Sequence, residues 1–367
     1  MPNPTQPSPS LTYRESGVDA EGAAQGLKGL LDSLRKTIAL RPAGEGRVLL
    51  DFGHYANVIQ VGGTGLAIST DGVGSKILVA EMAGAFDTLG IDLVAMNVND
   101  LLCVGAEPLA MVDYIAVRRL EDRLLADLGR GLLAGAEQAR ITIPAGELAQ
   151  LPDMLIGPRP DQALDLVGTA VGVVPPDRLL LGDRITSGDM VFGFAATGLH
   201  SNGYTLARRV LLERARLDLD RHIPELGRTL AAELLEPTRI YVALALDLLG
   251  SGHVHGFAHI TGDGLRNLLR LNPRASYDFP ALPAPPPIFA LIAAHGPVAT
   301  AEMVATFNMG IGFIAVVAPT GADHVTAAAA RHGIGVHFLG TAVADGRREI
   351  RAGAPRFLAT LDGVAGG

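Results

Sequence analysis

The 367-residue sequence lacks several features that define other classes of protein. Its single cysteine, Cys103, excludes both a disulfide framework and a zinc cluster built from cysteines. No apolar run approaches the roughly eighteen residues that a membrane span needs. The proline-rich start has neither the charge nor the apolar core of a signal peptide, so we expect a disordered tail over residues 1–12. These absences indicate a cytoplasmic globular protein.

The chain also lacks an excess of basic residues. Its 30 lysines and arginines are outnumbered by 38 aspartates and glutamates, which gives a formal net charge of −8. Phosphate backbones demand a basic face, so this balance argues against a nucleic-acid partner. A nucleotide-binding enzyme can still be acidic overall, because a metal ion and local lysines neutralise the phosphates of a small ligand. We therefore expect a small-molecule ligand, with neither nucleic acid nor membrane as a partner.

The sequence does contain short β-rich runs that alternate with segments of helical spacing. The pattern predicts strands at 47–50, 65–68, 109–117, 166–174, 190–195 and 311–317, and helices at 90–105, 120–140, 204–213 and 265–271, with a last helix–strand unit within 322–339. Such alternation is typical of a mixed α/β (α+β) fold. Pro175 and Pro176 interrupt the pattern, so we place a boundary there between domains 13–175 and 176–367.

The most informative segment, Ser-Thr-Asp-Gly-Val-Gly-Ser-Lys at 69–76, follows the strand expected at 65–68. Gly72 and Gly74 allow backbone N–H groups to approach phosphate oxygens, and Lys76 supplies a cation. Asp71 repels phosphate unless a divalent cation lies between them, so the combination suggests a metal–nucleotide site. The spacing is not that of a Walker loop. An ordinary surface turn is the alternative.

Four polar side chains interrupt the apolar helix expected at 90–105, namely Asp92, Asn97, Asn99 and Asp100. Asp92 and Asn99 lie about two turns apart and share a face, with Asp100 beside them. Burying such groups without partners costs free energy, so they need hydrogen bonds, a metal or solvent. A stripe facing water is the alternative, but its narrowness among apolar residues favours a site.

Two polar loops in the second half each lead into an expected helix. Free N–H groups at a helix start attract anions, although each loop alone is more often an ordinary helix cap. Each loop also carries a histidine, whose charge can change near neutral pH. A lone histidine before a cap is usually structural, whereas two such loops alongside an acidic site favour proton handling. The candidate residues are His200, Ser201, Asn202, His259, Thr261 and Gly262.

Read in order, these segments resemble the aminoimidazole ribonucleotide synthetase family, also called phosphoribosylformylglycinamidine cyclo-ligase. The first matches are T-D-G-V-G-S-K at 70–76, G-I-D-L-V-A-M-N-V-N-D-L at 90–101 and G-A-E-P at 105–108. Others are Y-x-x-x-G-V-D at 13–19, G-L-H-S-N-G-Y at 198–204, P-T-R-I-Y at 237–241, H-I-T-G-D-G at 259–264 and T-F-N-M-G-I-G at 306–312. One such motif is weak, but the same series in the same order is specific.

This resemblance implies a two-domain fold and a homodimer. The N-terminal domain would contribute a mixed sheet that pairs with the sheet of a second subunit, and the C-terminal domain would be α/β. The implied reaction belongs to purine biosynthesis and uses ATP with Mg²⁺. ATP phosphorylates the formyl amide oxygen of formylglycinamidine ribonucleotide, and the ring then closes to aminoimidazole ribonucleotide with release of ADP and phosphate.

The resemblance also implies roles for the residues that match its motifs. Asp71 and Asp100 would hold Mg²⁺ against the ATP phosphates, with Glu147 as a third candidate metal ligand. Gly72, Gly74 and Lys76 would lie near the phosphates. His200 and His259, together with Asp100, would act in catalysis. The substrate-binding residues would be Ser201, Asn202, Thr261 and Gly262.

The sequence departs from the family pattern at several positions. Leu148 replaces a threonine after Glu147, so a contact that depends on a hydroxyl is lost while metal binding survives. Asp263 replaces a glycine and adds negative charge near a predicted anion site. The family's N-terminal helix often carries a lysine near the nucleotide; that position aligns with Leu31 here, and Lys28 lies one turn earlier.

Two alternatives therefore stay open. One is a divergent relative that uses ATP on another small substrate, which the departures at Leu148 and Asp263 motivate. The other is a non-catalytic nucleotide-binding regulator. Retention of Asp71, Asp100 and both loop histidines speaks against a regulator, because such a protein has no chemical reason to keep them together.

Overall fold

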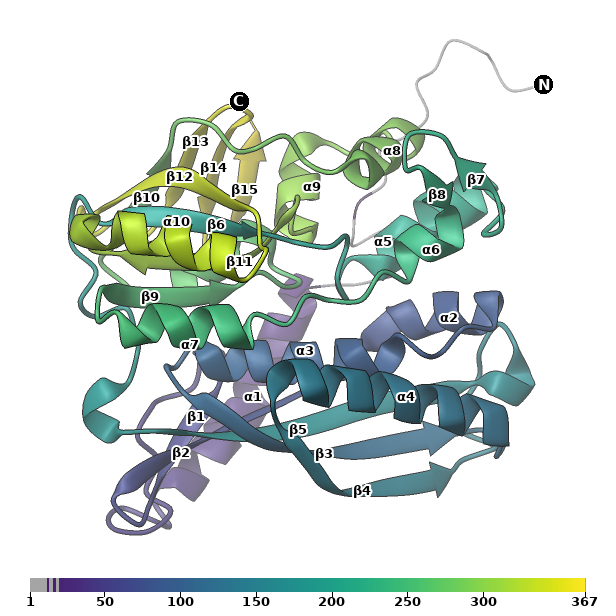
Figure 1. Ribbon diagram of the computed structural model, residues 1–367, viewed down its shortest axis with the longest axis horizontal. Coiled ribbons are helices and arrows are strands. Elements are labelled where there is room, and N and C mark those ends of the chain that lie inside the picture. The colour runs from purple at the N-terminus through teal and green to yellow at the C-terminus, as the bar shows by residue number, and fades with distance from the viewer. Residues whose placement is uncertain (1–11, 13–15, 18–19, 367) are drawn as a thin grey trace.

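The computed structural model describes residues 12, 16–17 and 20–366. The tail expected over 1–12 lies outside the described residues except for Thr12, and so do Tyr13, Val18 and Asp19 of the opening motif. The described chain forms two stacked halves, each built on its own sheet (Figure 1). This arrangement confirms the predicted mixed α/β class. None of the helices in the described ranges has the length and apolarity to cross a membrane.

The first half contains a five-stranded sheet of order β1-β2-β5-β3-β4. Neighbouring strands are antiparallel except β3 and β4, which run parallel, so the sheet is mixed as predicted. The strands are β1 (Asn57–Val61), β2 (Thr64–Gly72), β3 (Glu107–Val117), β4 (Thr142–Gln150) and β5 (Leu164–Val174).

Helices α3 (Leu89–Leu102) and α4 (Asp122–Ala139) cover one face of this sheet (Figure 1). Alternate residues of β5, from Leu164 to Val174, are buried on that side. Gly90 of α3 lies against the backbone of α4, where any Cβ would collide with Gly131 and Leu132, so the two helices pack closely. The first half also contains α1 (Ala20–Ile38), η1 (Gly74–Lys76) and α2 (Ile77–Ala83).

The second half contains an eight-stranded sheet of order β15-β14-β13-β10-β12-β6-β11-β9. Every residue of β11 is buried, so this strand forms the centre of the second core. The strands are β6 (Met190–Ala195), β9 (Val254–His259), β10 (Ser276–Phe279), β11 (Ile311–Val317), β12 (Val336–Val343), β13 (Ile350–Gly353), β14 (Arg356–Thr360) and β15 (Gly363–Gly366), and a separate pair consists of β7 (His222–Ile223) and β8 (Arg228–Thr229).

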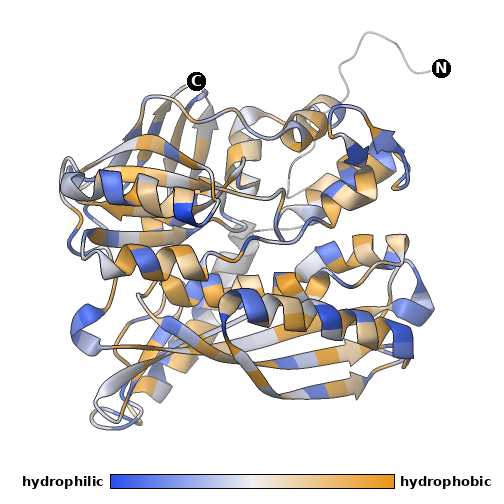
Figure 2. Cartoon of the chain, in the orientation of Figure 1, coloured by the Kyte–Doolittle hydropathy of each residue, from blue (hydrophilic) through white to orange (hydrophobic). Residues whose placement is uncertain are grey.

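The helices of the second half include α7, which packs against α3 and α4 and so joins the two halves (Figure 1). Figure 2 shows that apolar residues concentrate where these helices and the sheets meet. The helices are α5 (Tyr204–Arg208), α6 (Leu230–Leu234), α7 (Val242–Gly250), α8 (Pro287–His295), α9 (Thr300–Thr306) and α10 (Ala322–Arg331).

Several predicted elements are corrected by the structure. The strand expected at 47–50 makes one isolated bridge, from Val48 to Ile59. The pairing ends there because the Asn57 side-chain amide donates a hydrogen bond to the Leu50 carbonyl. The helix expected at 204–213 is the short α5 followed by a π-helical segment, Arg209–Arg214. The helix expected at 265–271 is the 3₁₀ segment η5, Gly264–Arg270, in which the Asn267 amide occupies the Gly264 carbonyl.

Candidate active site

The polar stripe of α3 lies in the seam between the two halves. Asp92 accepts hydrogen bonds from the Thr238 N–H at 2.7 Å and from the Ser201 hydroxyl at 3.2 Å. Asn99 accepts from the Tyr241 N–H at 3.0 Å. Asp92 and Asn99 are fully buried, so this part of the stripe does not face water. Helix α3 therefore binds the segments of the second half that surround the site.

Asp71 lies at the end of β2, which continues beyond the strand expected at 65–68. The Asn97 side chain of α3 holds the Asp71 backbone in place. Its Oδ1 accepts from the Asp71 N–H at 3.0 Å, and its Nδ2 donates to the Asp71 backbone carbonyl at 3.2 Å. The Asp71 carboxylate accepts from the Gly72 N–H at 2.8 Å. Gly74 follows with φ +70°, a left-handed conformation that suits glycine, and starts η1.

Asp100 of α3 and His259 of β9 are joined by a hydrogen bond of 2.9 Å between Oδ1 and Nδ1. The His259 side chain is fully buried, and its Nε2 has no hydrogen-bond partner among the described residues. A carboxylate on Nδ1 holds the proton there and leaves Nε2 as a lone-pair acceptor. The pair can therefore accept a proton at Nε2.

The Asp71 and Asp100 carboxylates are electrostatic neighbours. Burial raises the pKa of Asp71, and the nearby negative charge of Asp100 raises this pKa further. Two such carboxylates offer the hard oxygen ligands that Mg²⁺ prefers. Glu147 is exposed on β4, and the described chain contains no cluster of three or more histidine, cysteine or acidic side chains arranged to hold a metal.

Lys76 is fully buried in an ion pair with Asp92, 2.7 Å from its Oδ2. The ammonium also donates to the Glu236 carbonyl at 2.7 Å. Burial lowers the pKa of Lys76, and Asp92 opposes that shift. The bond to Glu236 links the first half to the second. The expected contact of Lys76 with phosphate stays a prediction.

His200 adopts φ +61°, a left-handed conformation that is unusual for a residue with a side chain. Its Nε2 accepts from the Thr197 N–H at 3.3 Å, and its Nδ1 has no partner in the part of the chain that the structure describes. Burial, followed by the charges of His259 and nearby cations, lowers the pKa of His200 well below 6.5, so the ring is neutral. Gly312 lies against this ring and the Tyr241 hydroxyl, where a Cβ would collide with both.

The two predicted substrate loops meet. A Cβ built on Gly262 would lie 3.3 Å from the Asn202 side-chain oxygen, and the buried Asn202 amide nitrogen has no partner within the described ranges. The Thr261 hydroxyl donates to the Asn267 side chain at 3.4 Å. Ser201 turns toward the seam and binds Asp92, as described above. The structure thus brings Asn202 and Gly262 together and places Ser201 within the interdomain network.

Sequence reasoning missed three residues beside this site. The Tyr55 hydroxyl donates to the Asn267 carbonyl at 2.6 Å, and the Arg270 guanidinium lies 5.1 Å from the centre of the Tyr55 ring. His54 packs against Tyr55 with a ring separation of 5.6 Å. One signal was available in the sequence: the unusual Asp263 requires a countercharge, and it pairs with Arg270 at 2.9 Å.

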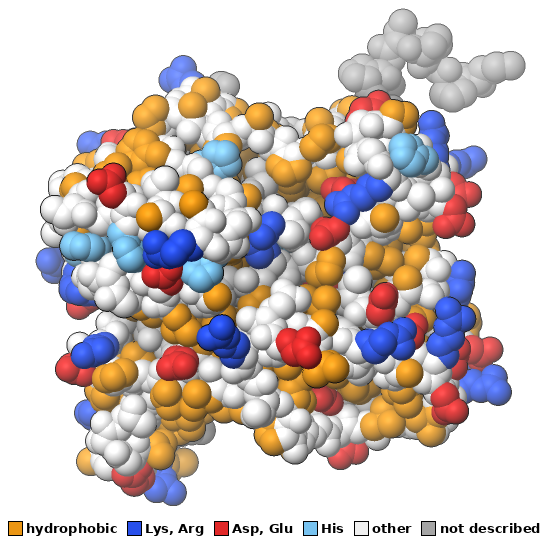
Figure 3. All heavy atoms as spheres, in the orientation of Figure 1, with side chains coloured by type: hydrophobic (Ala, Val, Ile, Leu, Met, Phe, Trp, Pro, Cys, Tyr) orange, Lys and Arg blue, Asp and Glu red, His pale blue; other side chains and the backbone are white. Residues whose placement is uncertain are grey.

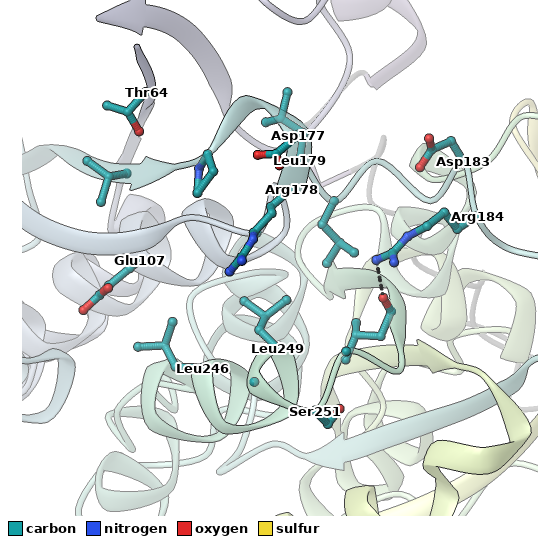
Figure 4. A pocket seen from close by; sticks show the side chains of 17 residues that line it. Thr64, Glu107, Asp177, Arg178, Leu179, Asp183, Arg184, Leu246, Leu249 and Ser251 are labelled. Atoms are coloured by element: carbon teal, nitrogen blue, oxygen red, sulfur yellow. Dashed lines mark hydrogen bonds between the residues drawn. The ribbon is translucent and has the colours of Figure 1, made fainter. Parts of the chain in front are cut away.

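A cavity of about 870 Å³ lies elsewhere, between the two halves near the segment that joins them (Figure 4). Arg178 points into it, above Leu246 and Leu249 (Figure 4). None of the candidate site residues lines this cavity. The outer surface in Figure 3 carries interspersed acidic and basic side chains with no single-sign patch on the visible face.

Two family models match the chain. The N-terminal domain of AIR synthase related proteins matches residues 53–174, and their C-terminal domain matches residues 186–353. The solved structure of AaThiL complexed with AMPPCP and TMP aligns with a TM-score of 0.56 over 88% of this chain and 92% of that chain, at 12% identity, which shows the fold alone. The fold and site thus define a two-domain protein of the AIR synthase related class.

Curated relatives narrow this class. Phosphoribosylformylglycinamidine cyclo-ligase from Thermococcus gammatolerans is 47% identical over 84% of this chain and 89% of its own length. The cyclo-ligase from Methanocaldococcus jannaschii is 42% identical over 91% of this chain and 92% of its own length. The chain therefore belongs to the phosphoribosylformylglycinamidine cyclo-ligase family, and the resemblance found in its motifs is confirmed.

Proposed function

We propose that this protein is an ATP-dependent cyclo-ligase of purine biosynthesis. It converts formylglycinamidine ribonucleotide to 5-aminoimidazole ribonucleotide and releases ADP and phosphate. The observation that carries this proposal is the meeting of Asp71, Asp100 and His259, from β2, α3 and β9, at the seam between the halves. Membership of the cyclo-ligase family supplies the substrate and the reaction.

We propose that Asp71 and Asp100 hold Mg²⁺ and, through it, the ATP phosphates. The donor set fits this role, since both ligands are carboxylates and the mutual repulsion that raises the pKa of Asp71 is relieved by a cation. The ion would neutralise charge on the phosphates. The backbone at Gly72 and Gly74 supports a neighbouring phosphate, because Gly74 is left-handed and has open space beside its Cα.

The reaction needs a phosphoryl transfer followed by ring closure. The formyl amide oxygen attacks the γ-phosphorus of ATP, and the bond to ADP breaks. An amidine nitrogen of the substrate then attacks the formyl carbon, which closes the ring, and loses a proton, and phosphate departs with the bonding electron pair. His259 suits acceptance of that proton, because Asp100 orients its ring and Nε2 has no hydrogen-bond partner among the described residues. His200 is neutral and can hydrogen-bond the substrate through Nδ1.

We also propose that the protein is a homodimer, paired through the sheet of the first half. Helices α3 and α4 cover one face of this sheet, while Leu109, Val112 and Tyr114 are 39–44% exposed on its strand β3. Exposed apolar surface of this kind marks an interaction site. Glu147 is exposed on β4, so we place its role as a metal ligand at the interface between subunits.

The division into domains 13–175 and 176–367 is part of the same proposal. It is supported by two sheets that share no strand and by β5 ending at Val174. A cytoplasmic location is proposed as well, because the substrates are the nucleotides of a biosynthetic pathway.

The test is an assay of the purified protein with ATP, Mg²⁺ and formylglycinamidine ribonucleotide. The proposal expects 5-aminoimidazole ribonucleotide to appear with an equal amount of ADP. ADP release with other small acceptors but not with this substrate would instead identify a divergent ATP-using relative. Nucleotide binding without any turnover would identify a regulator.

A further inference from the structure

A cation other than Lys76 is available to bind phosphate in the candidate site. The Lys76 ammonium is fully buried and already bonded to Asp92 and to the Glu236 carbonyl. Arg270 is one cation whose charge acts on the carboxylate pair: together with His259 it lowers the pKa of Asp71. Against the effect of burial, Tyr55, Asp263 and also Asp100 raise the pKa of Arg270. Arg270 therefore lies within electrostatic reach of the carboxylate pair.

The Arg270 guanidinium is held on two sides. Its Nη2 donates to the Asp263 carboxylate at 2.9 Å, and its Cζ lies over the Tyr55 ring, 5.1 Å from the ring centre. Tyr55 of the first half is held against the second half, because its hydroxyl donates to the Asn267 carbonyl. A guanidinium that lies over an aromatic ring and is paired with a carboxylate is held in place, which suits the recognition of an oxyanion.

Most of the hydrogen-bonding capacity of Arg270 is unused. A guanidinium has about five N–H donors, and within the described chain this one makes a single hydrogen bond, to Asp263. The side chain is 35% exposed, so a ligand can reach it. The remaining donors suit the paired oxygens of a phosphate group.

His54, which precedes Tyr55 in the sequence, also indicates that a ligand binds here. Both ring nitrogens of His54 are buried and lack a hydrogen-bond partner among the residues that the structure describes. Burial, and then the Arg270 charge, lowers the pKa of His54 to about 4, so the ring is neutral and does not compete with Arg270 for an anion. A buried imidazole without partners is a group that a ligand can satisfy.

We propose that Arg270 binds a phosphate group in this site, and that Asp263 and Tyr55 hold it in position to do so. Asp263, which replaces a glycine of the family pattern, thereby positions the phosphate-binding Arg270 and does not repel the ligand. The proposal rests on the proposed function for the identity of the ligands. The shared chemistry is a phosphate group, which either the nucleotide or the 5′-phosphate of the substrate can supply.

The test is calorimetric binding to the full-length protein, with two ligands measured separately. One titration uses the Mg²⁺ complex of a non-hydrolysable ATP analogue, and the other uses formylglycinamidine ribonucleotide. Arg270→Gln is expected to weaken one of them by about 10-fold or more, which corresponds to about 1.4 kcal/mol. A change in the first titration assigns Arg270 to the nucleotide, and a change in the second assigns it to the substrate phosphate.

Three further variants complete the experiment. Arg270→Lys keeps the charge but loses the planar fork, so it should recover part of the affinity. Asp263→Asn should weaken the binding of the same ligand. The control Arg266→Gln removes the other partner of Asp263, and its affinity for both ligands should stay within about twofold of wild type. Unchanged binding of both ligands to Arg270→Gln, or to Arg270→Lys if the glutamine variant does not fold, would overturn the proposal. A wild-type protein that binds the analogue but makes no product would contradict the proposed function alone.

Discussion

The carboxylate of Asp100 and the imidazole of His259 are 2.9 Å apart, although one belongs to a helix of the first half and the other to a strand of the second. Their hydrogen bond crosses the seam in which the candidate site lies. The relative position of the two halves thus decides whether the histidine is oriented. Asp92 and Asn99 fix that position from the same helix, through Thr238 and Tyr241.

Asp100→Asn tests the charge of this pair. The asparagine can still accept a hydrogen bond from the His259 ring, so the fold is expected to persist. The variant loses a metal ligand and the negative charge that keeps the proton on Nδ1 of His259. We expect kcat to fall by about 100-fold or more. Circular dichroism and thermal unfolding check the fold, and Asp247→Asn, which alters an acid bound to Arg331, is the control. Normal kinetics in Asp100→Asn would place this carboxylate outside the site.

Lys76→Met tests whether this lysine is structural. Removing the ammonium leaves Asp92 buried and unpaired, which typically costs about 3–5 kcal/mol of unfolding free energy. The double variant Lys76→Met/Asp92→Asn should regain part of that loss, and urea unfolding measures both. An unchanged unfolding free energy combined with weaker ATP binding would show that Lys76 serves phosphate instead.

Gly312→Ala tests how His200 is positioned. The added Cβ collides with the His200 ring and the Tyr241 hydroxyl, both buried, so we expect a loss of about 1–3 kcal/mol in stability together with reduced kcat. Gly129→Ala is the matched control, because no atom lies within 4 Å of its Cβ on helix α4. That control should be neutral or slightly stabilising. A fully active Gly312→Ala would separate His200 from the chemistry.

His54 should make folding stability depend on pH. Its pKa is about 4 in the folded protein against 6.5 for an unperturbed ring, so between these values the unfolded chain binds a proton that the folded chain does not. Stability therefore falls as pH decreases from about 6.5 to 4, by up to about 1.4 kcal/mol per pH unit from this group. Chemical unfolding over this range should show a shallower slope in His54→Gln. The exposed His337→Gln is the control, and equal slopes in wild type and His54→Gln would refute the assignment.

Val112→Glu tests the proposed dimer. Val112 is 41% exposed on β3, and a charge placed within an apolar interface should convert the dimer to a monomer and abolish activity. Leu133→Glu is the control, since Leu133 is 60% exposed on α4, in the helical layer on the other side of the sheet. Light scattering measures the mass of each variant. A wild-type protein that is strictly monomeric would contradict the dimer directly.

The long elements could be predicted from sequence because their patterns are strong. The strands at 190–195 and 311–317 are found at the predicted bounds, and the helix at 90–105 corresponds to α3. Strand β4 was missed because Pro144 and Gly146 break its pattern, and the parallel pairing with β3 that sustains it is non-local. Near the site, propensity failed where side chains compete with the backbone, as Asn267 does in η5.

The candidate site was predicted in part. The acids and histidines were identifiable because their residue types carry chemistry, and the polar stripe on α3 was identifiable because it interrupts an apolar helix. The contact of Lys76 with the Glu236 carbonyl could not be predicted, since it depends on the docking of the two halves. The same docking brings Tyr55 onto the segment that carries Arg270, across more than half of the chain.

The most direct test is a crystal structure of the protein with Mg²⁺ and a non-hydrolysable ATP analogue. We predict that carboxylate oxygens of both Asp71 and Asp100 coordinate an ion that also binds the phosphates, with His259 facing the substrate side. A nucleotide bound elsewhere, with these two carboxylates coordinating nothing, would contradict the account.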